Sequence, residues 1–218
     1  MQEIGFRQSA VSNLKPPKAA TMSRQLLLQT VKALEQTYEL IDRTVMERVA
    51  NLLNKSSMIH LYGLGASYLV MEDLQMKLVR IGRYCSLVHD LHLQMVDASN
   101  AKAGEVAIVA SYSGQTQEMI ALAKRLKERG CIVVAITQYA HNELAAQADY
   151  CLHVPVTEKK LRTSASSSHI TMLYIVEMLY QLLLEKDYDQ DMDRIIETGV
   201  LLEKKKIESD MEEDLSAE

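Results

Sequence analysis

Long apolar runs, a paired set of cysteines and an excess of positive charge are all missing from this sequence. No run approaches the roughly 20 apolar residues that a membrane-spanning helix needs. The first residues carry Arg7, Lys15 and Lys18 but lack the apolar segment of a signal peptide. These absences argue against a membrane protein and against a secreted one. We therefore expect a cytoplasmic location and no membrane partner.

The three cysteines lack the CxxC spacing of many zinc and redox sites. Cys85 and Cys151 lie within apolar runs, and Cys131 begins another. Reduced, buried cysteines with a structural role are the expectation for such positions. We expect neither a metal site nor a cofactor.

The net charge is −5, because 29 acidic residues outnumber 24 basic ones. A nucleic-acid-binding surface is therefore not the first expectation. The 218 residues are 48% hydrophobic, which is enough for one compact domain with some helical addition. We predict a polar segment over residues 1–21, a single domain with N-terminal helices over residues 22–207, and an acidic tail over residues 208–218.

The chain contains a repeated alternation of apolar runs with helical patterns. Such alternation implies right-handed crossovers and a parallel sheet with helices on both faces. Two helical patterns precede the first run, and a last one begins near Asp191. The runs predicted to be strands are Met58–Tyr62, Tyr84–Val88, Val106–Ala110, Ile132–Ile136 and Tyr150–Val154.

A glycine–hydroxyl turn over residues 63–67, named turn A, follows the first predicted strand. It contains Gly63, Gly65 and Ser67, and a helical pattern comes after it. A dinucleotide-binding fingerprint would need a third glycine, but Tyr68 stands in its place. Turn A is therefore not assigned to a dinucleotide.

A second turn of the same design over residues 111–116, named turn B, follows the third predicted strand. Ser111, Ser113, Gly114 and Thr116 place three hydroxyls around one glycine, just before a helical pattern. A helix N-terminus offers unpaired N–H groups and about half a positive charge, which suits an anion. Turn B therefore predicts a phosphate site, and the alternative is helix capping, the commonest role of such residues. Both turns lie at the carboxyl ends of strands, where parallel sheets bind ligands.

A serine-rich run opens the long helical pattern that follows the last predicted strand. The run, Arg162–His169, includes Ser166 and Ser167. Its serines either cap the helix and form a turn or help to close the ligand site.

The two turns together resemble the sugar isomerase (SIS) domain. The patterns G-x-G-x-S at residues 63–67 and S-x-S-G-x-T-x-E at residues 111–118 carry the resemblance, which covers about residues 22–200. Within that superfamily the sequence is most similar to the effector domain of RpiR-type transcriptional regulators. The resemblance implies a three-layer αβα sandwich with a five-stranded parallel sheet, a bound sugar phosphate, and a homodimer or tetramer.

The resemblance also implies which residues contact the ligand. Ser111, Ser113 and Thr116 would hold the phosphate, and Ser67 would bind the sugar or the phosphate. Gly114 and Gln115 would give backbone contacts, and serines near Ser166 would approach from the last helix. The implied ligand-binding residues are Gly65, Ala66, Ser67, Ser111, Tyr112, Ser113, Gly114, Gln115, Thr116, Ser166 and Ser167.

Two features depart from the regulator pattern. The sequence lacks a complete helix-turn-helix domain, so contact with DNA is expected only through such a domain. His169 and Glu177 stand where the regulators usually carry Arg and Asp. The effector contacts in that region are therefore left open.

Three functions are compatible with these residues, and a non-catalytic phosphosugar sensor is the one we expect. A sugar-phosphate aldose–ketose isomerase would need a positioned base, often a Glu on the helix after turn A. Lys77 and Arg80 lie on the inward side of that helix and are ionised near neutral pH, which makes them poor bases. His89 and His92 are the remaining candidate bases. A dimer scaffold with an empty site is the third possibility.

Overall fold

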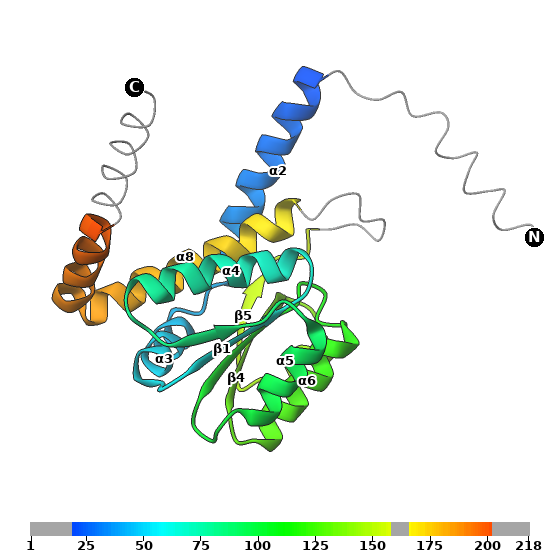
Figure 1. Ribbon diagram of the computed structural model, residues 1–218. Helices are drawn as coiled ribbons and strands as arrows, with labels where there is room; N and C mark the ends of the chain where they lie inside the picture. Colours follow the sequence, from blue (N-terminus) through cyan, green and yellow to red (C-terminus); the bar gives the residue numbers. More distant parts are fainter. Residues whose placement is uncertain (1–18, 158–165, 202–218) are drawn as a thin grey trace, which may run out of the picture.

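Five parallel strands form the centre of the computed structural model, which describes residues 19–157 and 166–201 (Figure 1). Their order across the sheet is β2-β1-β3-β4-β5, and every neighbouring pair is parallel. All five predicted strands are confirmed, and two of them match to the residue. The strands are β1 Ile59–Gly63, β2 Cys85–Leu87, β3 Val106–Ala110, β4 Ile132–Gln138 and β5 Tyr150–Val154.

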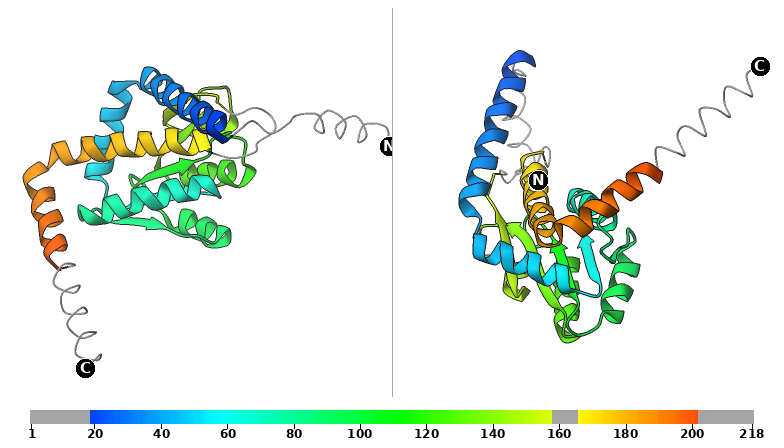
Figure 2. Two further views of the ribbon diagram at one scale, coloured as in Figure 1. Left: turned by 90° about the horizontal axis from the view of Figure 1, so that it is seen from above. Right: turned by 90° about the vertical axis from the view of Figure 1, so that its left-hand side faces the viewer.

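Helices cover both faces of the sheet, as Figures 1 and 2 show. The helices α3, α4 and α8 pack on one face, and α5, α6 and α7 pack on the other. This arrangement confirms the three-layer αβα sandwich. The bounds are α2 Ala19–Leu40, α3 Arg43–Lys55, α4 Ala66–Arg80, α5 Leu91–Asn100, α6 Gln117–Glu128, α7 Glu143–Gln147 and α8 Ser166–Lys186, followed by helical residues 188–201.

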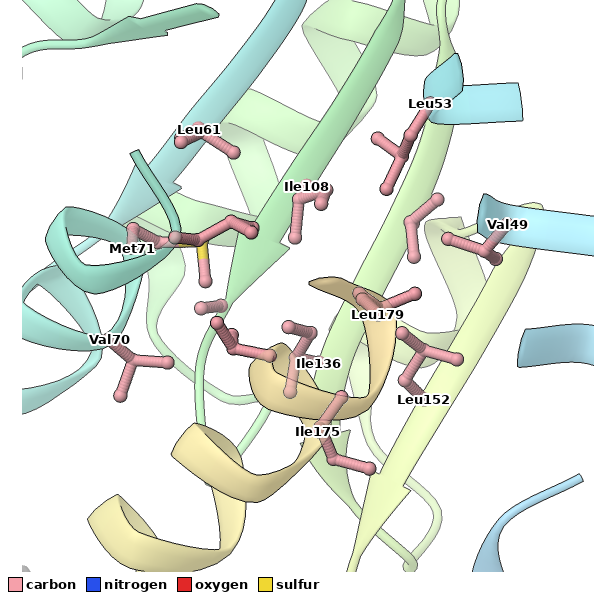
Figure 3. Packing of buried hydrophobic residues seen from close by; sticks show 14 of the residues in the cluster. Val49, Leu53, Leu61, Val70, Met71, Ile108, Ile136, Leu152, Ile175 and Leu179 are labelled. Carbon is pink, nitrogen blue, oxygen red and sulfur yellow. The ribbon is translucent and has the colours of Figure 1, made fainter. Parts of the chain in front are cut away.

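The larger core lies between the sheet and the helices α3, α4 and α8 (Figure 3). Leu61 of β1, Ile108 of β3 and Ile136 of β4 are fully buried there with Met71 of α4 and Ile175 of α8. Each such side chain stabilises the fold by about 1.5–3 kcal/mol through burial. The apolar strands follow from this arrangement, because helices cover both faces of a parallel sheet.

The opposite layer contains a buried polar cluster that sequence analysis did not anticipate. His60 of β1 is 5% exposed and lies between two carboxylates, with Nδ1 2.9 Å from Asp97 Oδ2 and Nε2 3.0 Å from Glu105 Oε2. Tyr62 and Ser86 also donate hydrogen bonds to Asp97. Because carboxylates only accept hydrogen bonds, this geometry suits an imidazolium that donates from both nitrogens.

The ionisation of this cluster follows from its geometry. Burial alone would lower the pKa of His60, but the hydrogen bonds and charges of Asp97 and Glu105 outweigh it and raise the pKa. Burial alone would raise the pKa of both carboxyls, but hydrogen bonds from His60 and other donors lower it. All three shifts favour the charged forms, in agreement with a His60 ring that donates to both carboxylates.

Within the described residues the chain begins with α2, which projects away from the sheet at one end of the molecule (Figures 1 and 2). It begins at Ala19, three residues before the predicted domain start, and packs against α8 and β5. Ala33 and Thr37 are buried in this contact. The exposed apolar side chains of α2 are Met22, Leu26, Leu27, Leu28, Val31 and Tyr38.

Arg83, which lies between α4 and β2, binds residues at the start of the helical segment 188–201. Both terminal nitrogens of Arg83 donate to the carboxylate of Asp191, at 3.1 and 3.0 Å. Asp191 is 0% exposed, and Arg83 also donates to Asp187 at 3.1 Å. Arg194 donates to Ile81 O at 2.8 Å. These contacts hold helical residues 188–201 against the rest of the domain, and the helix begins before Asp191, near which it was expected to start.

Across residues 19–157 and 166–201, none of the helices combines the length and apolarity that a bilayer crossing requires.

Candidate functional site

Turn A and turn B leave the sheet side by side. The parallel register pairs Gly63, the last residue of β1, with Ala110, the last residue of β3. The order β2-β1-β3-β4-β5 also changes direction between these two strands. In open parallel sheets, ligands bind beyond the carboxyl ends of the strands at this kind of switch point. The fold therefore brings both predicted turns to its expected ligand position.

The hydroxyls of turn B are arranged in a way that capping does not explain. Ser111 Oγ and Thr116 Oγ1 lie 3.1 Å apart and bond to each other. Thr116 is the N-cap residue of α6, yet its side chain makes no capping hydrogen bond. Ser113 Oγ accepts from Gln115 N at 3.2 Å. The N-terminal N–H groups of α6 lack intrahelical acceptors, and Thr116 does not cap them, so they suit an external anion.

Gly114 is required by two features of turn B. Its φ of +63° lies in the left-handed region that side chains rarely adopt. A β-carbon at this position would also lie 2.0 Å from Asn142 Oδ1, which no side chain can tolerate. The backbone of turn B can follow its path only with glycine here.

Turn A brings the start of α4 close to the end of β1. A β-carbon on Gly63 would lie 2.9 Å from the main-chain carbon and oxygen of Ser67. Gly65 is the N-cap residue of α4 and has no side chain with which to cap it. Ser67 is partly exposed, and its N–H donates to Leu64 O at 3.1 Å. Ser67 thus belongs to the turn that leaves the sheet at the switch point, beside turn B.

The start of α8 contacts turn A. His169 Nδ1 lies 3.2 Å from Ala66 O and donates to this carbonyl. His169, one of the two residues that depart from the regulator pattern, thus touches turn A. Ser167 is partly buried in the same turn of α8. The side chain of Ser166 lies outside the described residues.

Tyr112 has a role that differs from that of its neighbours in turn B. Its side chain is 6% exposed, and its hydroxyl donates to Pro155 O at 3.2 Å and accepts from Thr157 N at 2.8 Å. The side chain therefore holds the segment after β5 against turn B. Any ligand contact of Tyr112 would come from its main chain.

The candidate bases differ in their surroundings. Lys77 Nζ lies 2.7 Å from Asp73 Oδ2 and 3.3 Å from Glu177 Oε2. Burial alone would lower the pKa of Lys77, but these two carboxylates outweigh it and raise the pKa, so Lys77 stays a cation. His89 is exposed after β2 and packs edge-on against Tyr68, with ring centroids 4.8 Å apart. His89 is thus the candidate base that lies beside turn A.

The described part of the chain offers no evident metal-binding site. Within residues 19–157 and 166–201, no group of three or more His, Cys, Asp or Glu side chains could hold a metal ion. The arrangement at the switch point instead offers hydroxyls and helix N-termini. These groups suit an anionic ligand that also carries hydroxyl groups.

Sequence analysis missed the segment between β4 and α7, which lies against turn B. Asn142 is the N-cap residue of α7, and its Oδ1 accepts from Ala145 N at 2.9 Å. The same side chain also contacts Gly114. No local pattern could have indicated this contact, because the two residues are brought together by the pairing of β3 with β4.

Comparison with known proteins gives consistent results. A family model described as SIS domain matches residues 52–182. The HTH-type transcriptional regulator TTE0211 of Caldanaerobacter subterraneus is 32% identical over 176 residues, which are 81% of this chain and 62% of the relative. The chain spans about three fifths to two thirds of the length of the curated relatives it matches.

Two solved structures are similar to this chain. The NanR protein of Vibrio vulnificus, complexed with ManNAc-6P, has a TM-score of 0.78 and 28% identity, and the match covers 91% of this chain and 72% of NanR. The sugar isomerase domain of an RpiR transcription factor from Sphaerobacter thermophilus has a TM-score of 0.72. At 16% identity, with 81% of this chain and 97% of that one covered, this second likeness concerns the fold alone.

Proposed function

The chain belongs to the SIS domain family, and on this basis we propose that it is the non-catalytic phosphosugar sensor of an RpiR-type transcriptional regulator or a stand-alone relative. One observation carries the proposal. Turn A and turn B meet at the switch point between β1 and β3, where the N-terminus of α6 is not capped by Thr116. Hydroxyls and helix N–H groups in that position suit a phosphate ester.

The phosphate is assigned to turn B. Ser111, Ser113 and Thr116 would donate hydroxyl hydrogen bonds to its oxygens, and the N–H groups at the start of α6 would add theirs. Hydrogen bonds to a charged group contribute about 1.5–3 kcal/mol each, more than bonds between neutral partners. Turn B would therefore supply the part of the binding free energy that comes from the phosphate, whichever sugar carries it.

The sugar is assigned to turn A and the start of α8. Gly65, Ala66 and Ser67 lie beside turn B, and His169 reaches the Ala66 carbonyl from α8. Ser166 and Ser167 begin the same helix. Because sugars differ in the stereochemistry of their hydroxyls, the side chains of this part of the site would select among sugar phosphates.

The likeness to NanR supports an amino-sugar phosphate as the first ligand to test. That protein was solved with ManNAc-6P, and it is 28% identical to this chain. Hexose 6-phosphates and N-acetylmuramic acid 6-phosphate carry the same phosphate ester and belong in the same experiment.

Oligomerisation and DNA contact are proposed to lie outside the ligand site. The exposed leucines of α2 would pack against a second copy of the chain in a homodimer or tetramer. DNA contact would come from a helix-turn-helix domain, as the name of the relative TTE0211 suggests. A regulator of this kind works where the DNA is, so we place the protein in the cytoplasm.

An isomerase is the second candidate, because His89 lies beside turn A and could act as a base. An assay for conversion of the bound sugar phosphate distinguishes the sensor from the isomerase. The sensor should bind a sugar phosphate and leave it chemically unchanged when the mixture is followed by NMR. Conversion between aldose and ketose phosphate that disappears in His89→Ala would establish the isomerase instead.

A thermal-shift screen tests the proposed function directly. The panel contains ManNAc-6P, hexose 6-phosphates, the matching free sugars and inorganic phosphate. A ligand at about one hundred times its Kd stabilises the protein by about 2.7 kcal/mol. Each kcal/mol raises the Tm by roughly 2–4 °C for a domain of this size. A shift with one sugar phosphate and none with its free sugar is expected, and no shift with any phosphate would overturn the proposal.

A further inference from the structure

Residues 137–144, named the β4–α7 segment, bind the main-chain carbonyl groups of turn B. Three consecutive carbonyl oxygens of turn B accept hydrogen bonds from this one segment. The bonds run from Gln138 N to Tyr112 O at 2.9 Å, from Gln138 Nε2 to Ser113 O at 3.5 Å, and from Leu144 N to Gly114 O at 3.0 Å. Thr137 Oγ1 adds a fourth bond, to Tyr112 O, at 3.3 Å.

These bonds direct the carbonyl oxygens of turn B toward the β4–α7 segment, while two N–H groups of the same peptides bond within the turn, Gly114 N to Ser111 O at 3.0 Å and Gln115 N to Ser113 Oγ at 3.2 Å. A peptide group carries partial positive charge on its N–H and partial negative charge on its oxygen. A phosphate is attracted by the first and repelled by the second, so a phosphate-binding turn must direct its oxygens elsewhere. In turn B, all three oxygens between Tyr112 and Gly114 are directed toward the β4–α7 segment.

Asn142 organises the β4–α7 segment. Its side-chain amide donates to Ala140 O at 2.9 Å and to Gln138 O at 3.3 Å, while its Oδ1 accepts from Ala145 N at 2.9 Å. Asn142 is only 2% exposed. It also fills the space beside Gly114, where a β-carbon would lie 2.0 Å from Oδ1. One side chain thus shapes the segment and sets its distance from turn B.

We propose that Asn142 is the positioning residue of the phosphate site, which holds the β4–α7 segment against Gly114 so that the carbonyl groups of turn B face away from the phosphate. Asn142 does not need to touch the ligand for this role. The inference rests on the proposed function, because it assigns a role within the same site.

The capping role and the positioning role of Asn142 use different atoms. Capping of α7 needs only an acceptor for Ala145 N, and Ser and Asp supply one as well as Asn. Positioning also needs the two donations from Nδ2 to the carbonyls of Gln138 and Ala140. Asn142→Ser and Asn142→Asp keep the cap and lose these donations. The two variants therefore separate the roles, whereas Asn142→Ala removes both.

The test compares Kd with folding for wild type, Asn142→Ser, Asn142→Asp and Asn142→Ala. Isothermal titration with ManNAc-6P and with inorganic phosphate gives the Kd, and urea unfolding gives the stability. We expect Asn142→Ser to stay folded, with a stability below that of wild type because two buried hydrogen bonds are lost, and to bind both ligands about tenfold more weakly, which is about 1.4 kcal/mol. The loss should be equal for the two ligands, because turn B contacts only the phosphate. Asn142→Asp should bind more weakly still, since its charge lies near the phosphate.

Asp42→Ala is the matched control for loss of a helix cap. Asp42 caps α3 by accepting from Thr44 N at 2.9 Å and from Val45 N at 3.1 Å, and α3 packs on the face of the sheet opposite to α7. This variant should lower stability as Asn142→Ala does and leave both Kd values unchanged.

Each outcome bears on a different claim. Wild-type Kd values in Asn142→Ser and Asn142→Asp would overturn the inference and leave Asn142 as a helix cap. Sugar phosphate binding by wild type would uphold the proposed function in that case. Failure of wild type to bind any sugar phosphate or inorganic phosphate would overturn the proposed function, and the inference with it.

Discussion

Gly63 ends β1 directly opposite Ala110, which ends β3, in the parallel register of the sheet. This pairing is the reason why two turns that are 44 residues or more apart in the chain lie side by side as one candidate site. Each turn begins on a buried strand that is held by neighbours on both sides. Little rearrangement is therefore needed before a ligand can bind, which favours affinity.

Ser113→Ala should weaken phosphate binding by about tenfold or more, because it removes one hydrogen bond to a charged group. Ser113 is partly exposed in turn B, and its hydroxyl accepts from Gln115 N. Titration of the variant with the sugar phosphate found in the thermal-shift screen measures the loss. Ser99→Ala on α5 is the control, since Ser99 bonds to Met95 O and to Arg125 away from both turns. Equal Kd values for the two variants would remove Ser113 from the site.

Gly114→Ala should destabilise the protein more than Gly104→Ala does. Both glycines have positive φ, +63° and +85°, and the left-handed conformation costs a side chain about 1–2 kcal/mol. Only Gly114 also has a neighbour, Asn142, within reach of the added carbon, because nothing lies within 4 Å at Gly104. Urea unfolding of both variants gives the difference. A smaller effect at Gly114 would contradict the close packing of Asn142 against turn B.

The His60 cluster should make stability depend on pH at the alkaline side of neutrality. The pKa of His60 is raised in the fold, so its stabilising effect is fully present below about pH 6.5, the ordinary pKa of histidine. That effect is lost as the pH rises through the raised value. Asp97 and Glu105 have lowered pKa values, so their effect is present above the ordinary carboxyl pKa and is lost as the pH falls through the lowered values.

Urea unfolding across pH 5 to about pH 9 tests this prediction, a range that spans the ordinary pKa of histidine. The free energy of unfolding of wild type should fall toward the alkaline end. His60→Asn keeps a polar side chain but cannot take up a proton, so its curve should be flatter above about pH 6.5. Parallel curves for the two proteins would show that His60 does not titrate as its contacts imply.

Arg83→Ala should lower the free energy of unfolding by about 3 kcal/mol or more, because it leaves the buried carboxylate of Asp191 without its bidentate partner. Lys127→Ala is a suitable comparison, since Lys127 and Asp149 form an ion pair near the surface. Loss of such a pair costs at most about 1 kcal/mol. Similar values for the two variants would mean that the last helix is not held by Arg83.

Leu27→Glu should shift the protein toward the monomer if α2 forms the contact between copies. Leu27 is 61% exposed on α2, and a buried charge without a partner opposes association. Sedimentation or light scattering at several concentrations measures the change. Gln29→Glu is the control, because Gln29 is exposed on the same helix and adds the same charge without removing an apolar side chain. An unchanged mass for Leu27→Glu would place the contact elsewhere.

The strands and the two turns could be predicted from the sequence because each has a recognisable local pattern. The apolar run Val106–Ala110 and the glycine–hydroxyl pattern after it can be recognised without any knowledge of their neighbours. The contacts of Asn142 with Gly114, and of His60 with Asp97 and Glu105, could not be predicted in this way. They join residues 28, 37 and 45 positions apart and depend on how strands and helices pack.

The directions in which side chains point could not be predicted from the sequence either. Tyr112 lies between two phosphate-binding candidates, and its type does not reveal that its hydroxyl bonds to main-chain groups after β5. Ser111 and Thr116 bond to each other across four intervening residues, and this contact depends on the path of the turn and not on residue type alone. Local patterns thus indicated the candidate site, while the arrangement of its side chains depends on the packing.

As related sequences diverge, different requirements act on the glycines and on the hydroxyl-bearing residues of the two turns. Gly63 is fixed by the main chain of Ser67, and Gly114 is fixed by its positive φ and by the side chain of Asn142, whether or not a ligand is present. The hydroxyls of Ser113 and Thr116 bond within turn B, to Gln115 N and to Ser111 Oγ, but the path of the backbone does not require them. A descendant of this protein that lost its ligand would therefore keep the glycines and be free to change the hydroxyls. Comparison of these two sets of positions among relatives would distinguish working sensors from those that retain only the architecture.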